Sequence, residues 1–139
     1  HVILRYRIEQ ALIRGDLKLA EVPAAWNESF KQLLGLDVPS DREGCLQDIH
    51  WFDGAFGYFP CYSLGAMTAA QFFEAACQAK PGIPAEIEQG RFGTLQGWLH
   101  ANVHELGSSL STREIVTKAT GRPLDIAVFK RHLAQRYLS

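Results

Sequence analysis

The sequence predicts an all-α protein, and three observations support this. Apolar residues recur at steps of three and four positions, as in Leu4, Ile8, Ala11 and Leu12, which is the spacing of one helix face. Glycines such as Gly15 and Gly35 follow several of these runs, at positions where helices commonly end. No segment shows the strict alternation of apolar and polar residues that is typical of a half-buried strand. We therefore expect helices throughout, with one irregular loop in the middle of the chain.

Length and composition are those of an ordinary globular domain. The chain has 139 residues, of which 47% are hydrophobic and 21% charged, so we expect a single helical domain over residues 1–139. The net charge is −1 with no basic stripe, which argues against a nucleic-acid partner. No apolar run approaches the roughly 20 residues of a membrane span. Cys45, Cys61 and Cys77 form no Cys-x-x-Cys pair and indicate reduced thiols in a cytoplasmic protein.

The first helix is predicted over residues 1–14, with Gly15 as its C-terminal cap. Arg5 and Glu9 lie four residues apart at the edge of its apolar stripe. A surface ion pair between these two side chains is the simplest explanation of their spacing, and a functional Arg5 is the alternative. The chain begins within this apolar pattern without a cap or an initiator Met, which favours the C-terminal piece of a longer protein.

A second helix is predicted over residues 24–34, because Pro23 suits a first helical position and Gly35 a C-cap. Its buried face is expected to comprise Trp26, Phe30, Leu33 and Leu34. The segment Ser40–Glu43 has the spacing of a capping box and is expected to open a short helix toward Gln47.

Later helices follow from the same signals. They are expected over residues 62–79, 84–89 and 92–106, then from the capping box that begins at Ser111 to Gly121, and finally after the cap Asp125. In the last helix the apolar residues that share one face are Ile126, Phe129, Leu133 and Tyr137.

The stretch Gly44–Gly65 has the composition of a segment that lines a binding or catalytic site. It contains polar and aromatic side chains interspersed with four glycines, and glycine allows sharp turns and close backbone approach. A buried core segment would instead carry apolar residues at a regular spacing. An aromatic-rich loop that packs on its own domain is the alternative interpretation.

One histidine pair does not predict a catalytic metal site. His100 and His104 have the spacing that places two imidazoles on one helix face, as in the zinc motif H-E-x-x-H. The position of the general base is occupied by Ala101, and Glu105 is expected to point elsewhere. We interpret the pair as two surface histidines on an amphipathic helix.

Two motifs in the central stretch resemble a known family. Residues 44–51 have the pattern G-x-x-Q-D-x-H-W, and residues 56–65 read Phe-Gly-Tyr-Phe-Pro-Cys-Tyr-Ser-Leu-Gly. Together they resemble the signature of the carboxypeptidase Taq family of metal-dependent carboxypeptidases. A third motif of that family, I-R-x-x-A-D, aligns with residues 4–9, where the Arg is kept as Arg5 and the last two positions are Ile8 and Glu9. The resemblance extends over essentially the whole chain.

The resemblance implies roles for six residues. A guanidinium can hold a carboxylate through two hydrogen bonds, so Arg5 is expected to bind the C-terminal carboxylate of a peptide. His50 and Tyr62 are expected to donate to the oxyanion, with Tyr58 as the competing tyrosine. A core histidine is the alternative for His50. The residues expected to orient His50 or line the pocket are Gln47 and Asp48.

The resemblance also implies a divalent metal, zinc or cobalt, that activates a water and acts as a Lewis acid. In the family the ligands are an H-E-x-x-H motif and a downstream Glu, which would precede the helix with Arg5; this sequence contains no such motif. We therefore expect one part of a metallocarboxypeptidase site that is inactive alone, from an enzyme that forms homodimers. A non-catalytic helical interaction module is the alternative. Cys61 occupies a position where the family commonly has a small hydroxyl residue.

Overall fold

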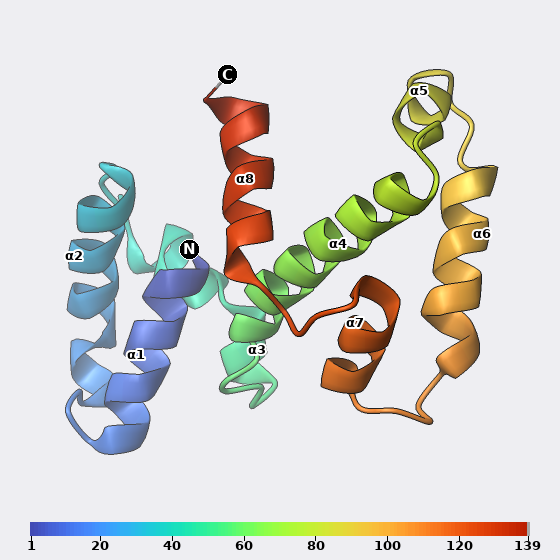
Figure 1. Cartoon of the computed structure of the whole chain (residues 1–139). Coiled ribbons are helices and arrows are strands. Elements are labelled where there is room, and N and C mark those ends of the chain that lie inside the picture. The colour runs from blue at the N-terminus through green and yellow to red at the C-terminus, as the bar shows by residue number, and fades with distance from the viewer. Residues whose placement is uncertain (139) are drawn as a thin grey trace. The chain divides into compact units, whose positions relative to one another are not determined.

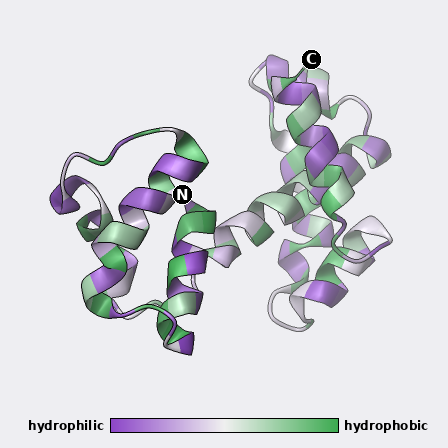
Figure 2. Ribbon diagram, turned by 90° about the vertical axis from the view of Figure 1, so that its left-hand side faces the viewer, coloured by the Kyte–Doolittle hydropathy of each residue, from purple (hydrophilic) through white to green (hydrophobic). Residues whose placement is uncertain are grey.

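The computed structural model describes residues 1–138 and consists of helices joined by turns (Figure 1). No strand occurs among these residues, and the predicted all-α class is confirmed. The chain divides into two compact units, residues 1–63 and 64–139. Green hydrophobic and purple hydrophilic residues are interspersed along the helices of both units (Figure 2).

The first unit begins with two helices whose ends follow the predicted glycine signals. Helix α1 spans Val2–Arg14 and α2 spans Val22–Leu34, and a short 3-10 turn, η1 (Leu19–Glu21), precedes α2. Gly15 and Gly35 end the two helices in the left-handed region, with φ of 79° and 71°. A side chain would be strained there, so glycine is the residue that these helix ends require.

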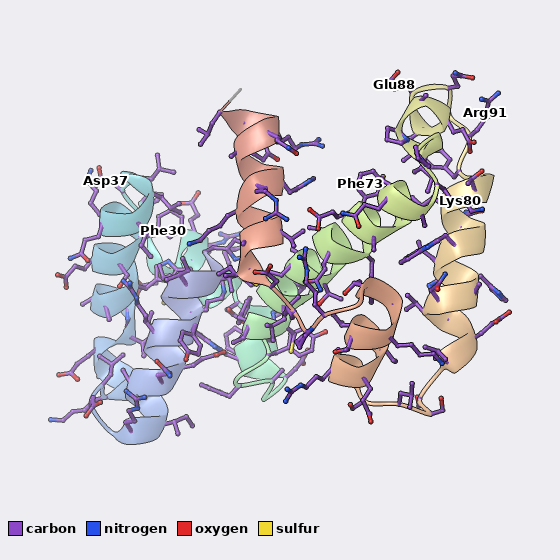
Figure 3. All side chains as sticks on the ribbon, viewed as in Figure 1. Phe30, Asp37, Phe73, Lys80, Glu88 and Arg91 are labelled. Atoms are coloured by element: carbon purple, nitrogen blue, oxygen red, sulfur yellow. The ribbon has the colours of Figure 1, made fainter. Side chains whose placement is uncertain are left out.

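The core of the first unit forms where α1 and α2 meet the segment around Cys45. Phe30 is half-buried and lies on α2 with its ring stacked on Trp26 at 6.3 Å (Figure 3). The predicted burial of Leu33 and Leu34 is wrong, because both are exposed on the last turn of α2 and belong neither to this core nor to its half-buried rim. The fully buried members of this core are Leu4, Ile8, Val22, Trp26 and Cys45.

The expected short helix after Ser40 is instead two 3-10 turns, η2 (Asp41–Glu43) and η3 (Cys45–Gln47). Gly44 separates them, since its φ of −114° and ψ of −118° are incompatible with a continuous helix. The Ser40 hydroxyl contacts the Glu43 carboxylate at 3.2 Å and makes no capping hydrogen bond to the backbone. The predicted capping box is therefore wrong, because the Ser40 and Glu43 side chains contact each other and Ser40 does not cap the backbone.

Two helices follow in the motif region. Helix α3 is a single turn, Ile49–Phe52, and α4 spans Pro60–Ala79. α4 begins two residues earlier than the predicted Tyr62, because Pro60 has the fixed φ that suits a first helical turn. Tyr62 thus lies within the first turn of α4, close to the predicted start of this helix.

The second unit contains the rest of α4 and four further helices. These are α5 (Ile83–Glu88), α6 (Gly93–Asn102), α7 (Thr112–Thr120) and α8 (Ile126–Tyr137), with the 3-10 turn η4 (His104–Leu106) after α6. The predicted continuous helix over residues 92–106 is interrupted at Val103, where φ is −128° and ψ is −57°.

Predicted caps in the second unit are confirmed. Ser111 and Glu114 form a reciprocal capping box at the start of α7, and Asp125 accepts a hydrogen bond from the backbone N–H of Ala127 at the start of α8. Gln71 of α4 is fully buried, and its side-chain oxygen accepts the backbone N–H of Asp125 at 2.7 Å. This bond ties the connection before α8 to α4.

The apolar stripe predicted for α8 is not its buried face. Ile126, Leu133 and Tyr137 are exposed, whereas Val128 is buried and lines a depression of about 350 Å³ together with Phe73 of α4 (Figure 3). Helical spacing identifies an apolar face, but the neighbouring helix decides which side is covered. Among the described residues, none of the helices has the length and apolar character needed to cross a membrane.

Candidate active-site wall

Helix α1 places Arg5 in an aromatic and acidic setting within the first unit. The guanidinium carbon lies 4.5 Å from the centroid of the Trp26 ring and 4.8 Å from that of Phe59. Its Nε donates to a carboxylate oxygen of Asp48, and its Nη1 lies 3.1 Å from Nδ1 of His1. These contacts hold the planar group in one orientation, because each restricts a different edge or face.

Glu9, one turn further along α1, is not the partner of Arg5. Its carboxylate is buried and accepts from the indole Nε1 of Trp51 at 2.9 Å and from the backbone N–H of Gly57 at 3.1 Å. The surface ion pair between Arg5 and Glu9 is therefore not formed, and the two side chains contact different parts of the central stretch.

Asp48 joins Arg5 to the helix that carries His50. It is the N-cap of α3 and accepts from the backbone N–H groups of His50 at 2.9 Å and Trp51 at 3.1 Å, in addition to the Arg5 guanidinium. The Asp48 side chain is completely buried. A buried carboxylate is stable only when donors compensate for lost hydration, and here one cation and two backbone groups do so.

His50 and Tyr62 form a direct hydrogen bond. Nε2 of His50 lies 2.9 Å from the Tyr62 hydroxyl, and Nδ1 lies 3.6 Å from the Asp48 carboxylate. When the neutral ring carries its proton on Nδ1, the Tyr62 hydroxyl donates to Nε2. When the ring is protonated on both nitrogens, Nε2 donates instead and the Tyr62 proton is free for another acceptor. The pair can therefore offer the Tyr62 proton to a bound group only in the second arrangement, because in the first one Nε2 of His50 takes that proton.

The other predicted residues lie at the edge of this arrangement. The ring of Tyr58 is 5.5 Å from that of His50 and 5.4 Å from that of Tyr62, and its side chain is about half exposed. Gln47 is exposed and donates to the backbone carbonyl of Arg42.

One depression of about 360 Å³ collects most of the predicted residues. Arg5, Gln47, Asp48, His50 and Tyr62 line it, whereas Tyr58 does not. Sequence reasoning missed Phe59, which is buried beneath His50 with ring centroids 4.7 Å apart. The only feature of the sequence that could have indicated Phe59 is its position between Tyr58 and Tyr62. The remaining lining residues are His1, Val2, Ile49 and Phe59.

Among residues 1–138, no group of three or more His, Cys, Asp or Glu side chains is arranged to hold a metal ion. The His100 and His104 rings lie 6.4 Å apart at 82° on either side of the break at Val103. The expectation that Glu105 points elsewhere is wrong, because this break brings its carboxylate to 3.2 Å from Nδ1 of His100.

The described cysteines are free. Burial is the main cause that raises the pKa of the Cys45 thiol, and the nearby charge of Asp41 acts in the same direction. Burial also raises the pKa of the Cys77 thiol. Since the thiolate is the reactive form, both groups are poor nucleophiles at neutral pH.

Comparison with known proteins identifies relatives over nearly the whole chain. Residues 1–137 match the family described as carboxypeptidase Taq (M32) metallopeptidase. The chain is 36% identical over 137 residues to "Carboxypeptidase 1" of Bacillus subtilis and 35% identical to "Thermostable carboxypeptidase 1" of Thermus thermophilus. Both alignments cover 99% of this chain but only 27% of the relative. The chain therefore spans about a quarter of the length of these relatives.

Solved structures agree with this result. The structure titled "Trypanosoma Cruzi Metallocarboxypeptidase 1" superposes with a TM-score of 0.94 at 43% identity, over 100% of this chain and 29% of that protein. A carboxypeptidase of Pyrococcus furiosus superposes with a TM-score of 0.92 at 31% identity, over 99% of this chain and 28% of that protein.

Proposed function

This chain belongs to the carboxypeptidase Taq (M32) metallopeptidase family, and we propose that it supplies the substrate-carboxylate and oxyanion side of a metal-dependent carboxypeptidase site. The observation that carries the proposal is the arrangement of Arg5, His50 and Tyr62 around one depression, with buried Asp48 between the first two. The reaction would be removal of C-terminal residues from peptides by the full-length protein.

Arg5 is the proposed anchor for the substrate carboxylate. Asp48 contacts its Nε and His1 contacts its Nη1, so Nη2 and the second N–H of Nη1 are the donors proposed to receive a carboxylate. Trp26 and Phe59 restrict the plane of the group, so little side-chain entropy would be lost on binding. Arg5 is not an isolated cation, because Asp48 balances its charge before substrate arrives.

His50 and Tyr62 are the proposed donors to the oxyanion that forms when the scissile carbonyl is attacked. Donors that are already aimed at the developing charge stabilise the transition state without reorganisation. The hydrogen bond between the two side chains fixes both in place, and Phe59 supports the imidazole ring from one side. Tyr58 is the second candidate tyrosine, and we propose that Gln47 contacts substrate from the rim of the depression.

The family description includes a metal, and we propose zinc or cobalt in the full-length protein. The metal would activate the attacking water. The described residues of this chain do not fit a metal site, so we propose that its ligands come from other parts of the full-length protein. We also propose that residues 1–139 are a single domain of a larger protein. The full-length protein is proposed to form a homodimer and to be cytoplasmic. Sedimentation analysis of the full-length protein tests the homodimer.

Substitution of Arg5 tests the proposed function directly. In the full-length enzyme, Arg5→Lys keeps the charge but loses the planar fork, and we expect activity on peptides with a free C-terminus to fall by about 10-fold or more. Arg7→Lys is the matched control, because Arg7 is an exposed arginine on the same helix. Rates should be measured on paired peptides with free and amidated C-termini. Unchanged kinetics in Arg5→Lys would remove Arg5 from this role.

The second candidate function is a non-catalytic helical module that keeps the family's fold. The exposed apolar side chains of the first unit favour it, among them Ile49 and Phe52. A full-length protein that lacks the H-E-x-x-H motif and releases no C-terminal residues would support this alternative.

A further inference from the structure

Glu9 is a buried carboxylate for which the proposed chemistry has no use. Its side chain lies in the first unit and the residue is only 3% exposed. One oxygen accepts from the Trp51 indole at 2.9 Å and the other from the Gly57 amide at 3.1 Å. These partners are 42 and 48 residues away in sequence, so Glu9 links α1 to two points of the central stretch.

The two partners of Glu9 flank the residues of the proposed site. Trp51 follows His50 in α3, and its ring is held between Trp26 at 5.8 Å and Phe56 at 6.2 Å. Gly57 has a φ of 81° and forms the turn from which the chain continues toward Tyr62. Glu9 therefore fixes α3 on one side and the turn before α4 on the other.

Arg5 and Glu9 connect α1 to α3 at two points. Arg5 holds Asp48 at the start of α3, and Glu9, one helical turn later, holds Trp51 near the end of α3. The bond between His50 and Tyr62 depends on this placement, because the two residues lie 12 positions apart on different helices. A shift of about 1 Å in such groups can lower a rate by about 10²-fold.

We propose that Glu9 is a positioning residue that sets the geometry of His50 and Tyr62, and this inference rests on the proposed function. Both of its partners are donors, so both of its oxygens must accept. An amide at this position offers one oxygen and one NH₂ group, and the NH₂ group would face an N–H. Glu9→Gln thus breaks one of the two bonds with almost no change in size.

The first test follows the geometry in this chain by NMR. We expect Glu9→Gln to shift the ring nitrogen resonances of His50, the indole N–H of Trp51 and the amide of Gly57, and to speed exchange of that amide. Glu28→Gln is the control, because it makes the same chemical change at an exposed position of α2. A Glu9→Gln spectrum in which the His50 ring nitrogens do not move overturns the proposal.

The second test uses the full-length enzyme. Glu9→Gln should lower kcat by about 10-fold with KM changed by less than about 2-fold, because it disturbs groups that act in the transition state and leaves the Arg5 anchor intact. If Glu9 contributed only to stability, Glu9→Gln would lower the amount of folded enzyme. It would leave kcat per folded molecule and the His50 resonances unchanged, and that result would contradict the proposal.

A second variant covers the case in which Glu9→Gln does not fold. Trp51→Phe removes the indole donor together with part of the ring that contacts Trp26 and Phe56, and we expect it to shift the His50 resonances. Unshifted resonances in that variant overturn the proposal as well. If wild-type full-length protein releases no C-terminal residue from any peptide, the proposed function fails, while the His50 resonances still decide the positioning role of Glu9.

Discussion

Gly44 is a position of the motif where neighbouring atoms leave no room for a side chain. A Cβ at Gly44 would lie 2.6 Å from Cγ1 of Val38, 3.2 Å from the carbonyl oxygen of Ser40 and 3.3 Å from Nε1 of Trp26. We expect Gly44→Ala to destabilise this chain by about 1–3 kcal/mol through overpacking. Urea unfolding followed by tryptophan fluorescence measures the effect. Gly65→Ala, at an open position within α4, should instead stabilise by about 0.5–1 kcal/mol.

Tyr62 and Tyr58 can be separated by matched substitutions. Tyr62 bonds to His50 and lines the depression, so in the full-length enzyme Tyr62→Phe should lower kcat by about 10²-fold. Tyr58→Phe should have a much smaller effect, since Tyr58 lies outside the residues that line the depression. The fold of each variant should be checked by circular dichroism. A large loss in Tyr58→Phe together with normal turnover in Tyr62→Phe would reverse the assignment.

At the scale of one element, the capping box of α7 gives a prediction that depends on pH. Hydrogen bonds from the side chain and then the backbone of Ser111 lower the pKa of Glu114 from its ordinary value of 4.5. This carboxylate therefore stabilises the folded chain above its ordinary pKa, and the contribution is lost as pH falls through the lowered folded-state pKa. In Ser111→Ala the pKa of Glu114 should return toward 4.5.

An NMR titration of the Glu114 carboxyl carbon measures this pKa in both proteins. Thr117→Val serves as a control on the same helix, because the Thr117 hydroxyl donates to the backbone carbonyl of Arg113 and does not contact Glu114. A Glu114 pKa that is equally low in Ser111→Ala would mean that another donor holds the carboxylate.

At the scale of the whole molecule, we predict that this 139-residue chain alone is catalytically inert and binds no zinc tightly. A catalytic zinc needs three protein ligands and an open position for water, and the described residues offer no such group. Metal analysis of the purified chain and a peptide-release assay with added zinc or cobalt test this. Stoichiometric metal together with measurable turnover would refute it.

The same chain should also self-associate. Tyr58 and Tyr62 are nearly half exposed, and Phe52 is 72% exposed, so the central stretch presents a broad apolar and aromatic surface. Sedimentation velocity at several concentrations measures the association. A strictly monomeric chain at all concentrations would contradict this prediction.

The sequence by itself determined the helical class and most helix ends, and it predicted the segment that carries the candidate site. These features depend on chemistry within a few residues: the left-handed glycines Gly15, Gly35 and Gly121, the capping box at Ser111 and the cap at Asp125. The motif stretch was recognisable for the same reason, since its glycines and polar side chains are adjacent in the chain.

The tertiary structure alone decided the partners of the buried charges and the covered faces of the helices. Asp48 is 43 residues from Arg5, and no local pattern indicates that they meet or that Glu9 would bind Trp51 and Gly57. Periodicity shows that α8 has an apolar face. The buried residue of this helix is nevertheless Val128, because the side of α8 that carries Val128 faces α4. Contacts between distant segments depend on how the segments pack together, and the free energy of that packing is not encoded within any one helix.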